Sequence, residues 1–241
     1  MELGFYILLP LIAFIYAAVG HGGASGYLAL MALFGVSIMV MKPTALLLNI
    51  FVAGISFYQF YKKGYFKWNL FYPFVIISIP AAFVGGYLSV DSHIYKQILG
   101  VLLLFAVVRM LGLVGSSKAK DNELRLWQGL LIGAVIGFFS GLIGIGGGII
   151  LTPVILLLGW ASVKQTAAIS ALFIWVNSLA GFAGLYIKGV ELHFSYLLLI
   201  GLAVVGGLAG AYFGSSILKN KGLTRFLSIV LFLASIKLIF T

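Results

Sequence analysis

The sequence predicts an all-α protein that crosses a membrane many times, built from two repeats of inverted topology. Hydrophobic residues make up 63% of the 241 residues and charged residues only 8%, whereas an average soluble domain is about 45–50% apolar and about 25% charged. Apolar segments recur along the whole chain between short polar loops. They are too long for the strands of a transmembrane barrel, so we expect about 8–10 helical membrane segments.

The two halves of the chain carry the same landmarks at a spacing of 124 or 125 residues. Gly20-His-Gly22-Gly23 corresponds to Gly144-Ile-Gly146-Gly147, and Lys63-Gly64 corresponds to Lys188-Gly189. Inverted repeats of this kind are the usual construction of secondary transporters, which hold the substrate near the bilayer midplane where the repeats meet. The repeat therefore favours a transporter over a structural membrane protein.

These landmarks divide the chain into a first repeat at 1–113, a polar linker at 114–126 and a second repeat at 127–241. The segments expected in the two repeats are 4–19, 24–37, 43–61, 69–89 and 94–113, then 127–143, 148–160, 165–186, 194–214 and 223–240.

The first two segments of each repeat are short. About 12 to 16 helical residues span roughly 18–24 Å, less than the ~30 Å hydrocarbon core of a bilayer. Each pair either crosses a locally thinned bilayer or returns as a re-entrant hairpin, and the sequence leaves both alternatives open. Both give each half an odd number of crossings, so the second half is inverted relative to the first.

Basic residues gather in the loops 62–67, 118–125 and 219–225, which share one side of this topology. The positive-inside rule makes that side cytoplasmic and places both termini outside a cell inner or plasma membrane. Basic cytoplasmic loops therefore account for the net charge of +10. We expect no nucleic-acid partner.

Glycines interrupt each repeat where a buried helix would avoid them. Gly144, Gly146, Gly147 and Gly148, with Pro153 after them, end one helix and expose the N–H groups at the start of the next. A helix N-terminus carries unsatisfied donors and about half a positive charge, so it favours an anion. With the equivalent break at Gly20–Ser25, inverted halves would aim two such termini at one central region.

Close helix packing is the other use of membrane glycines. We assign that role to the face formed by Gly206, Gly207, Gly210 and Gly214.

Few other polar groups lie at membrane depth. His21 lies inside the first break and can donate to a ligand or carry a proton, and Thr166 and Ser170 share one helix face after the second. Asn49 and Asn177 must face the interior, for binding or for interhelical hydrogen bonds. The candidate substrate-binding residues are Gly20, His21, Gly22, Gly23, Ser25, Asn49, Gly144, Gly146, Gly147, Gly148, Thr166, Ser170 and Asn177.

Several chemistries are not expected. The chain has no cysteine, and its three histidines lack ligand spacing, so we expect neither a metal site nor a cofactor. The GxGGG run lacks the GK[ST] of a nucleotide-binding loop. The expected partners are the lipid bilayer, a small anionic solute, and a proton or sodium ion if transport is coupled.

The second break resembles the signature of the TauE/SafE family, the sulfite exporters and their relatives, in the pattern Gly144-x-Gly146-Gly147-Gly148-x4-Pro153. Gln165-Thr-Ala-Ala-Ile-Ser170 resembles the second polar patch of that family, and the resemblance covers essentially the whole chain. It implies a transporter of small, often sulfur-containing anions such as sulfite, thiosulfate or sulfonates. The first half departs from the pattern at Ala24, where the run would have its third glycine.

Two other functions fit parts of the sequence. Gly23-Ala-Ser25-Gly26 matches the motif around the nucleophile of rhomboid-type intramembrane serine hydrolases, which also require a histidine within hydrogen-bond distance of the serine. An anion channel could also use glycine breaks, although the sequence provides no ring of charge or repeated carbonyl filter.

Overall fold

A computed structural model of the chain describes residues 3–111, 123–190, 195–216 and 221–240, which form ten α-helices and no strand. The helices are α1 (Leu3–Ala18), α2 (Ala24–Leu33), α3 (Ile38–Lys62), α4 (Trp68–Tyr87), α5 (Ser92–Met110), α6 (Leu126–Ile143), α7 (Gly148–Leu157), α8 (Val163–Ile187), α9 (Ser195–Ser216) and α10 (Lys221–Phe240). Each predicted segment is a helix, and five of them are long and apolar enough to cross a membrane. The predicted class, an all-α membrane protein, is confirmed. Most of the predicted linker lies outside the described residues.

The short helices pair into hairpins. Gly4 and Phe5 near the start of α1 pack against Phe34 just after α2, and the rings of Phe5 and Phe34 lie 5.8 Å apart. Phe74 of α4 likewise contacts Gly133 in the first half of α6 and Trp160 just after α7. With 10 residues each, α2 and α7 rise only about 15 Å. Each pair thus returns toward the end of the molecule from which it starts, as the re-entrant alternative requires.

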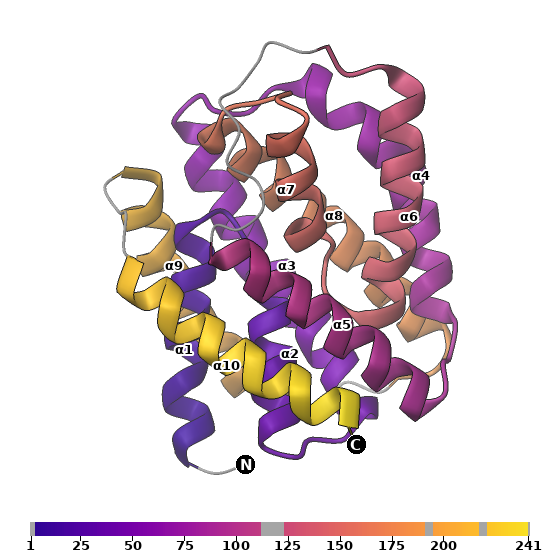
Figure 1. Cartoon of the computed structure of the whole chain (residues 1–241), viewed down its shortest axis with the longest axis vertical. Coiled ribbons are helices and arrows are strands. Elements are labelled where there is room, and N and C mark those ends of the chain that lie inside the picture. The colour runs from indigo at the N-terminus through magenta and orange to yellow at the C-terminus, as the bar shows by residue number, and fades with distance from the viewer. Residues whose placement is uncertain (1–2, 112–122, 191–194, 217–220, 241) are drawn as a thin grey trace.

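The two 25-residue helices, α3 and α8, pack against each other in opposite directions. Lys164 at the start of α8 lies 5.7 Å from the ring of Phe60 near the end of α3. Lys42 at the start of α3 lines the same pocket as Leu185 near the end of α8. The molecule therefore has a Lys42 end and a Lys164 end, and α1 begins and α10 ends at the Lys42 end, the lower end of Figure 1.

Helix packing in one half corresponds to that in the other. α1 packs along α9 as α6 packs along α4, and α3 contacts α9 as α8 contacts α4. α5 and α10 pack against each other and cross the front of Figure 1. This correspondence is what inverted repeats require, while the repeat and its boundaries stay a prediction.

Glycine faces explain how closely these helices approach. A side chain at Gly206, Gly210 or Gly214 of α9 would collide with the backbone of α1. The same holds for Gly133, Gly137 and Gly141 of α6, which lie against backbone carbonyls of α4. The predicted packing role is confirmed for these three glycines of α9, which have a counterpart on α6, while Gly207 lies against the Val52 side chain of α3.

Candidate functional site

The first break is the link between α1 and α2. Gly20 and Gly23 have φ angles of 76° and 98°, a left-handed conformation that side chains disfavour. Between them, His21 is 2% exposed, with Nδ1 3.0 Å from the carbonyl oxygen of Val19. The link therefore reverses the chain sharply and buries an imidazole at the tip of a hairpin.

The second break links α6 to α7 through more glycine. Gly144, Gly146 and Gly147 have φ angles of 88°, 75° and 79°. Gly147 is the N-cap of α7 as Gly23 is the N-cap of α2, and neither helix start has a side-chain cap. Both breaks therefore leave backbone donors to be satisfied in another way.

The structure brings the two breaks together. Nε2 of His21 lies 3.2 Å from the carbonyl oxygen of Gly148. A side chain at Gly22 or at Gly146 would collide with the same two residues, Asn49 of α3 and Ile174 of α8. The breaks thus meet between the two central helices.

A buried polar cluster connects the breaks to α8. Oγ1 of Thr152 lies 3.0 Å from Nε2 of His21 and 2.8 Å from Oγ of Ser170, and it donates to the carbonyl of Gly148 at 2.8 Å. Because the Thr152 hydroxyl has one proton, its oxygen accepts from at least one of His21 and Ser170. These three side chains are at most 4% exposed. Sequence reasoning missed Thr152, whose only signal is its place one turn after Gly148.

Of the two candidate asparagines, Asn49 links the first break to α8. Its Oδ1 accepts from the backbone N–H of Ala24 at 3.1 Å, and its Nδ2 donates to Oγ of Ser178 at 3.3 Å. Asn177 instead donates to the carbonyl of Phe173 in its own helix, and its buried Oδ1 has no partner among the described residues.

Two predicted residues form hydrogen bonds apart from this cluster. Oγ of Ser25 lies 2.7 Å from Oη of Tyr16. Thr166 donates to the carbonyl of Ser162 at 2.9 Å and has no hydrogen bond to Ser170 in the described part of the chain. The hydrogen-bond partner of Ser25 is Tyr16 rather than a histidine, so the described residues give the hydrolase alternative no support.

Buried donors without acceptors surround the meeting point. Within the described residues, no hydrogen bond leaves the N–H groups of Gly22, Gly23, Ser25 and Gly26, or those of residues 145–149. The buried Oη of Tyr27, whose ring packs against Gly23, has no partner there either. Buried donors are almost always satisfied in folded proteins, so this set requires an explanation.

Comparisons with known proteins agree with this architecture. Residues 6–238 match the family described as sulfite exporter TauE/SafE. The chain is 39% identical to the probable membrane transporter protein y4hK of Sinorhizobium fredii, with 98% of both chains covered. It is 30% identical to the probable membrane transporter protein YunE of Bacillus subtilis, over 82% of this chain and 79% of that protein. No solved structure gives a significant match.

Proposed function

Because the chain belongs to the sulfite exporter TauE/SafE family, a family of membrane transporters rather than enzymes, we propose that it is a secondary transporter of a small oxyanion. The cargo is a sulfur-containing anion such as sulfite, thiosulfate or a sulfonate, moved by alternating access. The protein lies in a cell inner or plasma membrane with both termini on the non-cytoplasmic side, on the strength of its basic loops.

The observation that carries this proposal is the meeting of two glycine breaks with unpaired N–H groups. Helix N-termini bind oxyanions through such donors and through the helix dipole. Here the donors come from both halves of the chain. They would replace the water around an anion without a full positive charge in the bilayer, which is costly.

The position of the two breaks supports alternating access. Each is the tip of a re-entrant hairpin that belongs to one half, and the tips touch through His21 and Gly148. The surrounding residues are buried, so the centre is closed in this structure. We propose that the halves, 1–113 and 127–241, rock about this contact and open it to one side at a time.

Energy for uphill transport comes from an ion or substrate gradient, with His21 as the proton carrier if protons are used. The described acidic residues Asp91 and Glu123 are exposed in loops. His21 is buried where the substrate would sit.

Anion flux into proteoliposomes tests the proposal. Wild-type protein should take up at least one of sulfite, thiosulfate, methanesulfonate and acetate, with a rate that saturates. Thr152→Val and Ser170→Ala should each lower uptake roughly tenfold or more, since their hydroxyls position His21 and the Gly148 backbone and a shift of about 1 Å in a binding group can lower a rate up to about hundredfold. Ser235→Ala is the matched control, because Ser235 is 1% exposed but bonds within α10.

Three results would contradict the proposal. They are no uptake of any anion by wild-type protein, unchanged uptake in both cluster variants, and an equal loss in the Ser235 control. Flux that does not saturate would instead favour the channel alternative.

A further inference from the structure

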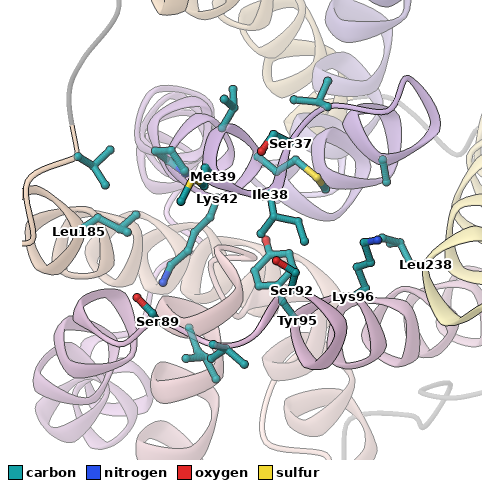
Figure 2. A pocket seen from close by; sticks show the side chains of 18 of the residues that line it. Ser37, Ile38, Met39, Lys42, Ser89, Ser92, Tyr95, Lys96, Leu185 and Leu238 are labelled. Carbon is teal, nitrogen blue, oxygen red and sulfur yellow. The ribbon is translucent and has the colours of Figure 1, made fainter. Parts of the chain in front are cut away.

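A pocket of about 880 Å³ opens at the Lys42 end of the molecule. It lies between the start of α3, the start of α5 and the ends of α8 and α10 (Figure 2). Leu142 lines it two residues before the second break, and Tyr95 in its wall donates to the carbonyl of Ile143 at 2.8 Å. The pocket is thus distinct from the meeting point of the breaks but adjoins one of them.

The charge of this pocket is one-sided. Lys42, Lys96, Lys188 and Lys237 line it, and none of the described lining residues is acidic. Asp91 lies in the adjacent loop, where its Oδ1 accepts from the backbone N–H of His93. The rest of the lining is largely apolar, and low-dielectric walls strengthen the field of the ammonium groups.

Lys42 lies deepest, at 8% exposure, and extends from α3 toward Ser89 in Figure 2. Its Nζ donates to the carbonyls of Gly85, Gly86 and Leu88, at 3.3, 3.1 and 3.4 Å. Carbonyl dipoles satisfy the three N–H groups but leave the positive charge uncompensated. An oxyanion can therefore be attracted to Lys42 and take the place of the most distant carbonyl, that of Leu88.

Helix capping accounts for only part of this arrangement. Lys164 caps α9 in the same way, donating to the carbonyls of Gly214 and Ser215 at 2.8 and 3.3 Å. Yet Lys164 lies against the rings of Phe60 and Tyr65, whereas Lys42 faces a cavity with three more lysines. Helix capping by Lys42 explains neither the cavity nor the positive charge that lines it.

We propose that these four lysines form a lysine vestibule, a second anion site that receives the substrate at the Lys42 end before it reaches the glycine breaks. The inference rests on the proposed function and deepens it, because such a site favours doubly charged over singly charged small oxyanions. The electrostatic energy between a lysine and a ligand is proportional to the charge of the ligand. A dianion therefore gains twice the electrostatic stabilisation that a monoanion gains.

The test compares a dianion with a monoanion in oriented proteoliposomes of neutral phosphatidylcholine. The vestibule variant is Lys96→Gln with Lys188→Gln, because both side chains are at least partly exposed and Lys42, which supports α4, stays in place. Its control is Lys62→Gln with Lys63→Gln, which removes the same charge from exposed positions at the end of α3, at the Lys164 end of the molecule.

For thiosulfate supplied at the Lys42 side in low salt, the KM of the vestibule variant should rise roughly tenfold, and for methanesulfonate roughly threefold. The maximal rate should stay within about twofold, and 0.5 M salt should remove most of the difference. Uptake from the Lys164 side, and all uptake by the control, should match the wild type.

An unchanged KM, equal effects on the two anions, or an equal change in the control would overturn the vestibule. So would a KM effect that appears only in vesicles containing anionic lipid, which would identify the pocket as a headgroup site. Failure of the proposed function looks different, because wild-type protein would then transport neither anion. Calorimetric titration of thiosulfate into wild-type and variant protein would still test the pocket in that case, and equal affinities would refute it.

Discussion

The first break, residues 20–25, and the second, residues 144–149, share a left-handed N-cap glycine and a helix of 10 residues after it. They differ in the groups that they leave for a ligand. In the first, Asn49 occupies the N–H of Ala24 and Tyr16 pairs with Ser25. In the second, the N–H groups of residues 145–149 have no acceptor among the described residues. The first break thus offers a shorter set of backbone donors together with the His21 side chain, and the second offers an unbroken run of five backbone donors.

Replacing a glycine of the second break should have the largest effect. Gly147→Ala forces a side chain into a φ of +79°, with Cβ 2.7 and 2.8 Å from Ile136 and Phe173. Transport should fall roughly hundredfold, since a shift of about 1 Å in a binding group can have that effect. Gly64→Ala is the control, because its φ is +76° and nothing lies within 4 Å. It should lose about 1–2 kcal/mol of stability but no transport, and a matching loss of transport would show that strain alone explains Gly147.

Replacing the imidazole of the first break should have the next largest effect. His21→Gln loses the ring contacts with Gly148 and Thr152, so transport should fall roughly tenfold. If His21 carries the coupled proton, the remaining flux should also no longer respond to a pH gradient. His93→Gln, an exposed histidine bonded to Gln97, should behave as wild type. A full gradient response in His21→Gln would exclude His21 as the proton carrier, and unchanged transport would exclude it from the binding site.

The smallest effect should come from the asparagine that supports the first break. Asn49→Leu removes the hydrogen-bond partner of the Ala24 N–H and of the Ser178 hydroxyl. This loss should lower the free energy of unfolding by about 1–3 kcal/mol. Transport should fall by only about twofold to fivefold, because Asn49 supports the site without supplying most of its donors. Asn177→Leu should lower the free energy of unfolding by less, since the hydrogen bond of Asn177 among the described residues stays within α8. Equal losses, measured by thermal unfolding in detergent, would contradict this ranking.

The helices were predictable because glycine, proline and charge punctuate a very apolar chain. The hairpins were not predictable. Hairpins and full crossings both give each half an odd number of membrane crossings, so both place the same basic loops on the same side. At the site, i,i+4 spacing suggested Thr166 as the partner of Ser170, but Thr166 lies in the first turn of α8 and bonds back to Ser162. Thr152 is the actual partner, and threonines often bond the carbonyl one turn back in any helix. The lysine vestibule was hidden because its charges come from four separate segments of the sequence.

The central claim is that one anion takes hydrogen bonds from the backbone of both breaks. Magnetic resonance of ¹⁵N-glycine-labelled protein in lipid, titrated with thiosulfate, tests it most directly. We expect the amide signals of Gly22 and Gly146 to shift together, with one shared dissociation constant. The amide signals of Gly133 and Gly137, which pack against α4, should not shift. Shifts confined to one break, or none under conditions where thiosulfate is transported, would contradict the account.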